Sequence, residues 1–435
     1  MSSLAENSVS IQIEVSRKER IFRCGEPVWF QVTVRSAEGE PVQSGELKLH
    51  FQNDFHDTIC CQTADLAQAN PVCVSETFSF PTFLTLTAQL GDVTQTASVG
   101  LEPERIEPGQ PMPADFWPFW DERLSVQRNL TAPVTLEEIT SHSTSSMTIF
   151  RVTVPTLDEQ FRYGWLALPK KKQSPFPVLV MVPGAGAGSG PVRSYVSRGT
   201  AVLMMNVFPY PTDLNPDVRR DQFEAFERDQ CGGRRYVWQN AANRETYFHR
   251  NSILAVSRAV DFLAELPEAD PARIGFLGVS QGGFYGLALG ALNPLVSAIV
   301  ASIPGYCDHG ASQQGRSPGG SKLYENVTDP AVRLVGPYFD GVNFARFIQT
   351  PIRLTVGFRD PTSNPSTVFA AFNQIPAAEK AILCEPLLGH ETSEKHREAL
   401  VWLSQKLGIE EVGNARNGRF PELPIVGTHG LKNLS

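Results

Sequence analysis

The pattern of apolar residues changes near residue 105, and this change constrains the fold more than any other feature of the chain. Up to that point, short segments such as VSIQIEV, PVWFQVTVRS and FLTLTAQL alternate apolar with polar residues, with Gly, Pro or Asn between most of them. This period of two is typical of antiparallel strands that bury one face. We therefore predict an immunoglobulin-like antiparallel β-sandwich domain over residues 1–104.

Beyond a proline-rich linker at residues 105–113, apolar runs alternate with longer amphipathic stretches. The expected strands begin near residues 161, 176, 200, 273, 297, 351 and 381, and the clearest helices cover residues 252–266 and 393–407. Strand and helix in alternation indicate a mainly parallel sheet with helices on both faces. We predict that an α/β catalytic domain covers residues 114–412 and that an irregular C-terminal tail follows over 413–435.

Length and charge limit the functions to consider. A chain of 435 residues exceeds what one hydrophobic core usually supports, which agrees with two domains. The formal net charge of -8, without a long basic run, argues against nucleic acid and against an anionic membrane surface as partners. No segment has the apolar length of a membrane span, so we expect a cytoplasmic protein, or an extracytoplasmic one if a signal peptide has been removed.

The metal-binding residue types do not form a motif. The seven cysteines are scattered through a long chain, unlike a disulfide framework. His50, His56, Cys60 and Cys61 lie close in sequence, but their spacing matches no metal site. The glycine-rich stretch VPGAGAGSG lacks the Gly-Lys-Ser/Thr ending of a phosphate loop. We therefore predict no metal and no cofactor.

The strongest chemical signal is the run Gly278-Val279-Ser280-Gln281-Gly282. An aliphatic strand ends at Gly278 and a helix-compatible sequence follows Ser280, so the serine lies at a strand-to-helix turn. Such a nucleophile elbow exposes the hydroxyl of its central residue, and its glycines avoid collisions with the neighbouring strand and helix. The context predicts a serine hydrolase of α/β-hydrolase fold with Ser280 as nucleophile, and a Gly-rich turn with a capping serine is the alternative.

A serine hydroxyl needs a base, which in this fold follows it in sequence. His390 comes directly after the last expected strand, where a loop would return it over the sheet, and we predict it as the base. His309 is the rival, although its neighbour Asp308 could not easily orient it as a triad acid. His396 lies in a helical stretch and His429 in the tail, so we expect both to be solvated.

The acid and the oxyanion donors are also expected at strand ends. Asp360 ends the strand PIRLTVGFRD and is the predicted acid, whereas a helix-capping role is its alternative. Gln281 should donate its backbone N–H to the oxyanion because it follows the nucleophile, and Ala185 should provide the second donor from the glycine-rich loop. Other candidates for the acid are Asp308, Asp329 and Asp340.

Four segments together resemble the acetyl xylan esterase and cephalosporin-C deacetylase family, known as carbohydrate esterase family seven. They are DFWPFWDERL, SRAVDFLAELPEADPARIGFLGVSQGG, YFDGVNFARFIQTPIRLTVGFRDPTSNPSTVFAAFN and LLGHE. The resemblance implies that Ser280, Asp360 and His390 form a catalytic triad with Gln281 as an oxyanion donor. It also implies the removal of O-acetyl groups from acetylated sugars or other small acetate esters, without a cofactor.

The chain departs from this family at two loops and at its N-terminus. Where family members usually have His-Gly-Tyr-Gly, this chain reads Pro183-Gly184-Ala185-Gly186, and NVFPYP replaces an Arg-Gly-Gln run. Ala185 keeps a backbone donor but offers no aromatic wall. Compact members tend to form hexameric rings, so a homo-oligomer is expected unless the added sandwich blocks or replaces that assembly.

Other functions stay open at this stage. An acyl-CoA thioesterase or acyltransferase, a longer-chain carboxylesterase and a serine peptidase share the fold, which does not fix the substrate. A carbohydrate-binding protein is the non-enzymatic alternative, with Trp29 or Phe30 of the sandwich as a platform. We also predict Arg234, Arg235 and Trp238 at the entrance of a substrate pocket, with a solvated insertion as the alternative interpretation.

Overall fold

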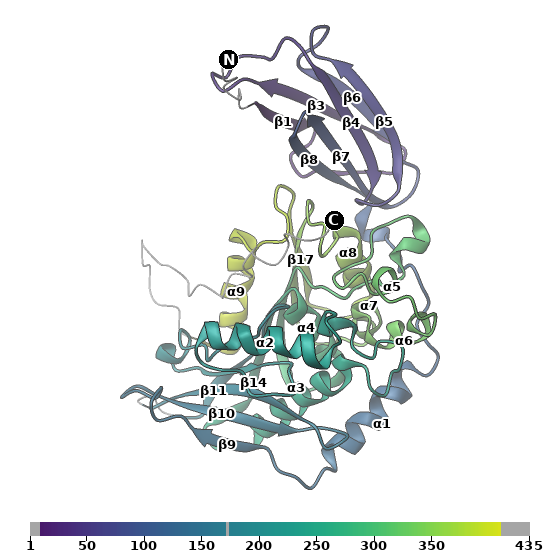
Figure 1. Ribbon diagram of the computed structural model, residues 1–435. Coiled ribbons are helices and arrows are strands. Elements are labelled where there is room, and N and C mark those ends of the chain that lie inside the picture. The colour runs from purple at the N-terminus through teal and green to yellow at the C-terminus, as the bar shows by residue number, and fades with distance from the viewer. Residues whose placement is uncertain (1–8, 171–173, 410–435) are drawn as a thin grey trace.

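The computed structural model describes residues 9–170 and 174–409. Figure 1 shows a strand-rich N-terminal part at the top of the molecule. A larger part, which consists of a central sheet and its helices, lies below the N-terminal part. The N-terminal part forms one sheet in the order β1-β3-β6 and another in the order β2-β8-β7-β4-β5. Its strands are β1 (Ser10–Val15), β2 (Ile21–Phe22), β3 (Pro27–Arg35), β4 (Glu46–Asn53), β5 (Thr58–Asp65), β6 (Val72–Thr77), β7 (Thr82–Leu90) and β8 (Val93–Leu101).

The alternation in β3 explains how this sandwich buries its core. Val28, Phe30 and Val32 are buried, whereas Trp29 between them is 54% exposed. Only Trp29 of the proposed aromatic platform therefore reaches the surface. The sequence pattern gave no sign of β5, which is mostly exposed and pairs with β4 at the edge of its sheet. Its polar composition reflects that edge position.

The larger part is built on a nine-stranded sheet in the order β17-β16-β15-β14-β12-β13-β11-β10-β9. Neighbours from β17 to β13 are parallel, and β11, β10 and β9 add an antiparallel extension. This is the mainly parallel sheet that the strand and helix alternation predicts. The strands are β9 (Thr135–Glu138), β10 (Met147–Pro155), β11 (Phe161–Pro169), β12 (Phe176–Val182), β13 (Ala201–Met205), β14 (Ala269–Val279), β15 (Val296–Ser302), β16 (Ile352–Gly357) and β17 (Lys380–Glu385).

Helices cover both faces of this sheet. Alternate residues of β12 divide between two cores: Val178 and Val180 lie with residues of α3 and α4, whereas Leu179 and Met181 lie with residues of α9. Because successive strand residues point to opposite faces, these helices must lie on opposite sides. The helices are α1 (Phe116–Arg128), α2 (Pro216–Gln230), α3 (Phe248–Glu265), α4 (Gln281–Leu292), α5 (Leu323–Asn326), α6 (Val332–Val335), α7 (Gly341–Ala345), α8 (Pro365–Gln374) and α9 (Glu394–Leu407).

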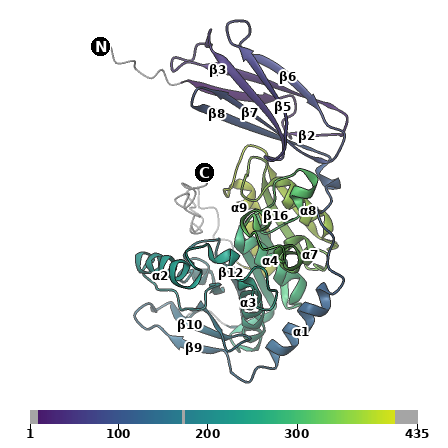
Figure 2. The ribbon, with the colours of Figure 1, turned by 45° about the vertical axis from the view of Figure 1, so that its right-hand side comes forward.

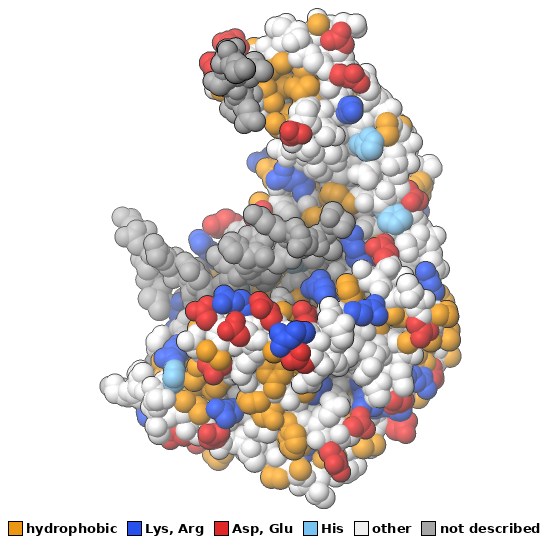
Figure 3. All heavy atoms as spheres, in the orientation of Figure 1, with side chains coloured by type: hydrophobic (Ala, Val, Ile, Leu, Met, Phe, Trp, Pro, Cys, Tyr) orange, Lys and Arg blue, Asp and Glu red, His pale blue; other side chains and the backbone are white. Residues whose placement is uncertain are grey.

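Charged side chains of both signs are interleaved over α2. In Figure 3 acidic and basic groups alternate along this helix, and Arg220 pairs with Asp217 at 3.2 Å. Arg228 pairs with Asp229 at 2.7 Å. The surface of α2 therefore presents no extended field of one sign. In the two described ranges, no helix is both long and apolar enough to cross a bilayer.

The sandwich and the α/β part share a packed boundary, on the side of β16 and α8 (Figure 2). Phe83 of β7 is completely buried and belongs to the core of the α/β part. Its ring lies 5.0 Å from that of Phe358, just after β16, and 5.7 Å from that of Phe369 in α8. The predicted linker is also anchored, because the Gly109 N–H donates to Asp308 at 2.8 Å. The two parts therefore form a continuous contact at the segment that carries Asp360.

Candidate active site

Ser280 lies in a sharp turn between β14 and α4. Its φ of 56° and ψ of -116° are unusual for a residue with a side chain. Its N–H donates to the Ser302 carbonyl and its own carbonyl accepts from the Gly305 N–H, both at 3.0 Å. A Cβ on Gly282 would lie 2.1 Å from the Val182 carbonyl oxygen. The glycine and the two backbone bonds thus explain how the chain holds this strained turn.

His390 and Asp360 extend from Ser280 as a hydrogen-bonded series. The Nε2 atom of His390 lies 3.0 Å from Ser280 Oγ, and its Nδ1 atom lies 2.7 Å from Asp360 Oδ2. Since a carboxylate only accepts, Nδ1 carries the proton and Nε2 is left to accept from the serine hydroxyl. Asp360 is completely buried, and Ser280 is nearly so. The structure thus brings together the three residues predicted as a triad, and their catalytic roles stay a prediction.

The loop after β16 fixes the Asp360 carboxylate. Its Oδ1 atom accepts from the Thr362 N–H at 2.8 Å and from the Ser363 N–H at 2.9 Å. These two bonds leave Oδ2 directed at His390. A local turn and the contact with His390 therefore use both oxygens of the same carboxylate.

The alternative acids and bases serve the structure elsewhere. Asp340 accepts from the backbone N–H groups of Asp308 and His309 at 2.7 and 2.8 Å. His309 is buried, and no contact joins it to Ser280 in the part of the chain that the structure describes. Asp329 accepts from a nearby backbone N–H in an exposed turn. These residues therefore do not compete geometrically for the positions of Asp360 and His390.

His396 corrects one expectation. The sequence predicts a solvated side chain, but His396 is only 5% exposed, and its Nδ1 atom lies 2.6 Å from Ser302 Oγ at the end of β15. It lies on the side of α9 that packs against the sheet. Its place in a helical stretch did not show which side of the helix it is on. Burial lowers the pKa of His396 to about 4, which keeps the ring neutral. His429 lies outside the described residues.

The two predicted oxyanion donors are free to bind a ligand atom. Among the described residues, no hydrogen bond engages the backbone N–H of Gln281 or that of Ala185. The Gln281 side chain accepts from the Tyr236 hydroxyl at 2.7 Å and from the Tyr306 hydroxyl at 3.2 Å. Its amide nitrogen lies 3.5 Å from the Pro183 carbonyl, in the loop that carries Ala185. Gln281 therefore links the elbow to the glycine-rich loop.

Tyr236 is a functional candidate that the sequence analysis missed. It is fully buried, and burial raises the pKa of its hydroxyl, so the group stays a neutral donor. The Gly186 backbone also hydrogen-bonds this hydroxyl. Tyr236 lies between Arg235 and Trp238, two of the residues predicted at a pocket entrance, but the sequence analysis did not single it out. Only the fold shows which residue of an aperiodic loop points inward.

The residues predicted at the pocket entrance lie around Trp238. The indole N–H of Trp238 donates to the Ser321 carbonyl at 3.0 Å, and the guanidinium groups of Arg234 and Arg235 each lie 5.9 Å from its ring. Arg234 also donates to the Asn326 carbonyl at 2.8 Å. These contacts hold the segment that carries Tyr236, and a role in substrate binding stays a prediction.

The N-terminal sandwich contributes a buried acid to the loop of Asp360. Asp54, at the turn between β4 and β5, is completely buried, and its Oδ2 atom accepts a hydrogen bond from the hydroxyl of Ser366 in the first turn of α8. Burial raises the pKa of Asp54 to about 7. The Arg359 guanidinium also donates to the Thr96 carbonyl in β8 at 3.4 Å. Nothing in the sequence near Asp54 indicates this contact, because its partner is more than 300 positions away.

Metal-binding residue types do not gather at this site. In residues 9–170 and 174–409, no group of three or more His, Cys, Asp or Glu side chains could hold a metal ion. All seven cysteines are free thiols. His50 pairs with Cys61 across β4 and β5 on exposed positions of the sheet.

Comparisons with known proteins identify a family that covers most of the chain. A family model described as acetyl xylan esterase (AXE1) matches residues 102–406. Acetyl esterase Axe7A of Xylanibacter ruminicola is 29% identical over 343 residues, which cover 76% of each chain. The family match begins at residue 102, directly after β8, so the strands of the sandwich lie outside it.

Two solved structures share the fold of the α/β part. An acetyl xylan esterase from Paenibacillus sp. R4 has a TM-score of 0.59 and 23% identity, and the match covers 70% of this chain and 98% of that one. Acetyl xylan esterase 1 from Thermoanaerobacterium sp. JW/SL YS485 has a TM-score of 0.58 and 22% identity, with 71% and 98% covered. The matched region of each relative is thus nearly its whole chain, whereas almost a third of this chain lies outside it.

Proposed function

The chain belongs to the acetyl xylan esterase family, and on that premise we propose that Ser280, His390 and Asp360 remove O-acetyl groups from acetylated sugars through an acyl-enzyme. Membership of the family makes the chain a deacetylating carboxylic ester hydrolase. The observation that carries the proposed mechanism is the hydrogen-bonded series from Ser280 Oγ through His390 to Asp360, with distances of 3.0 and 2.7 Å.

Acylation begins with proton transfer from Ser280 Oγ to His390 Nε2 as Oγ bonds to the acetyl carbonyl carbon. The carbonyl π electrons move to oxygen and give a tetrahedral oxyanion. When this intermediate collapses, the bond to the sugar oxygen breaks, and His390 Nε2 returns the proton to that oxygen. Asp360 holds the ring in the required tautomer and stabilises its charged form. The products of this half are an acetyl-serine and a free sugar hydroxyl.

The oxyanion is stabilised by the N–H groups of Gln281 and Ala185. Both are free of other partners in the described chain, so binding the oxyanion breaks no existing hydrogen bond. Tyr236 and Tyr306 fix the Gln281 side chain, which in turn contacts the loop of Ala185. Donors that are already in place stabilise developing charge without reorganising, which is where their catalytic advantage arises.

Deacylation repeats the chemistry with water. His390 Nε2 takes a proton from a water molecule as the water oxygen attacks the acetyl-serine carbonyl. The second tetrahedral intermediate then collapses, its bond to Ser280 Oγ breaks, and the proton returns to Oγ. Acetic acid leaves and the starting enzyme is restored. Protein groups and water account for every atom in both halves of this scheme.

The test is to replace Ser280 by Ala in the full-length protein and to measure the hydrolysis of a small synthetic acetate ester and of acetylated xylo-oligosaccharides. We expect kcat to fall by roughly 10⁴- to 10⁶-fold with little change in folding, because the missing group is the nucleophile. His390→Ala should cost a similar factor, and the double variant should cost no more than either single variant, since the residues act as a unit. Ser197→Ala, at an exposed serine, is the matched control.

A series of ester chain lengths, with an acyl-CoA and a peptide amide, tests the substrate. Acetate esters should react fastest, and mass detection should find acetate released from the oligosaccharides. Activity that peaks at butyrate or longer would contradict the acetyl preference and favour a longer-chain carboxylesterase. Faster cleavage of the acyl-CoA or the amide would favour a thioesterase or a peptidase. Normal turnover by Ser280→Ala would contradict the mechanism itself.

A further inference from the structure

A cavity opens on the α/β part, where the start of β11 faces the end of α2 and the beginning of α3. Its volume is about 340 Å³, within the size range of small-ligand sites. Arg162 and Arg250 line it, together with the rings of Phe226, Tyr247 and Phe248. None of these residues takes part in the proposed hydrolysis, so the cavity calls for an explanation of its own.

Arg162 is the unusual group in this cavity. It is only 3% exposed, yet no carboxylate pairs with it in the part of the chain that the structure describes. Its Nε and Nη1 atoms donate to Ser252 Oγ at 3.0 Å, to Gln160 Oε1 at 3.3 Å and to the Phe161 carbonyl at 2.9 Å. Its Nη2 group has no hydrogen-bond partner among the described residues. Neutral oxygens therefore solvate one side of a buried cation, and the other side is left for a ligand.

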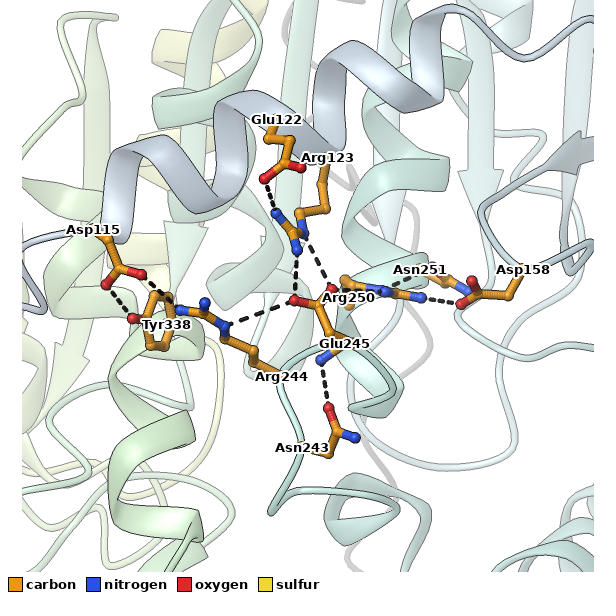
Figure 4. Close-up of polar contacts among 10 residues, drawn as sticks. All are labelled: Asp115, Glu122, Arg123, Asp158, Asn243, Arg244, Glu245, Arg250, Asn251 and Tyr338. Carbon is orange, nitrogen blue, oxygen red and sulfur yellow. Dashed lines mark hydrogen bonds and ion pairs between the residues drawn. The ribbon is translucent and has the colours of Figure 1, made fainter.

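The neighbouring Arg250 shows what a paired cation looks like in the same place. Figure 4 shows Arg250 between two carboxylates, and it pairs with Asp158 on one side and with Glu245 at 3.2 Å on the other. Glu245 is shared further with Arg123 and Arg244. The nearby acids are thus already committed to other arginines, and the charge left over at the cavity is the single positive charge of Arg162.

The electrostatic situation of Arg162 agrees with this count. Burial is the largest cause that lowers the pKa of Arg162 to about 10; Tyr285 opposes this shift, and the neighbouring Arg250 adds to it. A largely buried guanidinium without a paired anion is costly, because no opposite charge compensates for the hydration that it has lost. A bound anion would remove that cost. Because one positive charge, that of Arg162, lacks a partner, a singly charged anion is favoured over a phosphate, which carries up to two negative charges.

The rest of the lining suits a sugar ring. Gln160, Gln239 and Asn240 present neutral amides at the accessible rim, while the aromatic side chains form apolar walls. Amides can donate to hydroxyls and accept from them, and aromatic faces cover the C–H surface of a ring. The cavity is also wide enough for a monosaccharide rather than a bare acetate ion.

We propose that this cavity binds a monosaccharide-sized carboxylate, with the carboxylate paired to Arg162 and the sugar hydroxyls at the amide rim. The site is separate from the elbow, because the rings of Phe248 and Tyr236, 4.9 Å apart, lie between the cavity and the Gln281 side chain. It is independent of the proposed function, since it uses none of the residues that act on the ester.

Calorimetry and melting-temperature measurements on the full-length protein test this site with sodium glucuronate as the probe. Glucuronate should bind with a stoichiometry of one and raise the melting temperature, as a ligand of the native state must. Glucose, acetate and phosphate at matched ionic strength should each bind at least ~10-fold more weakly, because each lacks one of the required features. Phosphate binding as tightly as glucuronate would overturn the assignment of a single carboxylate, and equally tight acetate would overturn the sugar.

The variant Gln160→Glu gives a sharper test than removal of Arg162, which could prevent folding. Gln160 is exposed and already accepts from Arg162, so a carboxylate there should pair with the guanidinium from within the chain. We expect the melting temperature without ligand to rise and glucuronate affinity to fall at least ~10-fold. Gln313→Glu makes the same charge change at an exposed site in another segment and should alter neither quantity. Unchanged glucuronate binding by Gln160→Glu, or no binding by the unmodified protein, would overturn the proposal.

Discussion

Replacing Asp54 by Asn should remove a loss of stability that accompanies a rise in pH from about 4 to about 7. Asp54 is the buried acid that the sandwich inserts beside the loop of Asp360, and burial raises its pKa from 3.8 to about 7. The hydrogen bond from Ser366 and the charge of Arg316 oppose this rise, whereas the carboxylates of Asp308 and Asp360 add to it. Burial is the largest of these effects, so the folded protein holds a proton that the unfolded chain has already released.

The sign and the size of the effect follow from that difference. Between pH 3.8 and about 7 the native state binds more protons at Asp54 than the unfolded state, so stability decreases as the pH rises. The contribution is fully present below the unfolded pKa and is lost as the pH passes the folded one. A pKa difference of about 3 corresponds to roughly 4 kcal/mol, at 1.36 kcal/mol per pKa unit. Asn cannot titrate, so Asp54→Asn should lack this slope.

Urea unfolding at a series of pH values, followed by fluorescence and circular dichroism, measures the difference. Both probes are needed because the two parts of the chain can unfold separately. The free energy of unfolding of Asp54→Asn, relative to that of the unmodified protein, should increase steadily from about pH 4 to about pH 8. A change in stability caused by the amide itself would be the same at every pH and would not alter this slope. Asp308, whose pKa burial raises to about 6, titrates in both proteins and largely cancels. Asp92→Asn, at an exposed turn, is the control. A stability difference that is the same at both ends of the range would refute the reasoning.

Two further outcomes are expected from buried groups outside the proposed triad. Phe83→Ala should destabilise the protein by about 3–5 kcal/mol and weaken activity through the Asp360 segment, because its ring fills the boundary core. Trp29→Ala, at an exposed position, should change stability by less than about 0.5 kcal/mol, and similar losses for both in urea unfolding would contradict the packing. Burial lowers the pKa of His396 from 6.5 to about 4, so the folded protein loses stability as the pH falls through that window. In His396→Gln the free energy of unfolding should therefore fall by roughly 3 kcal/mol less over the same window. Urea unfolding at the same series of pH values would measure this change. A loss of stability between pH 6.5 and about 4 that is as large in His396→Gln as in the unmodified protein would contradict the prediction.

Strand and helix elements were predictable where the apolar period was strong. The segments at 252–266 and 393–407 correspond to α3 and α9, and the runs from 161 onward correspond to strands of the large sheet. The pattern missed β5, β9 and β10, which lie at sheet edges or next to them and have mixed exposure. Edge strands lack a continuously buried face, so their sequences carry little of the signal on which such predictions depend.

The error at His396 has a related cause. Its position in a helix was correct, but a helix that packs on a sheet leaves one face buried, and the sequence did not specify which residues line it. The segment around Trp238 shows the same limit, because the sequence did not indicate that Tyr236 turns inward. In both cases the sequence did not specify the direction of a side chain.

The sequence by itself determined the elbow and the order of its expected partners along the chain. Gly278, Ser280 and Gly282 lie in one short run, and a Cβ on Gly278 would collide with Gly282 in that same run, so local sequence can express this constraint. Asp360 and His390 follow strands that end at the same edge of a parallel sheet, so their meeting follows from topology.

Only the tertiary structure decided the long-range contacts around this centre. It placed Asp54 against Ser366, Tyr236 against Gln281, and Arg162 in a cavity where none of the described carboxylates pairs with it. These relations depend on how distant segments pack and on which charges already have partners. Neither property leaves a periodic or local mark in the sequence, which is why the meeting of Ser280, His390 and Asp360 could be predicted and the contacts around them could not.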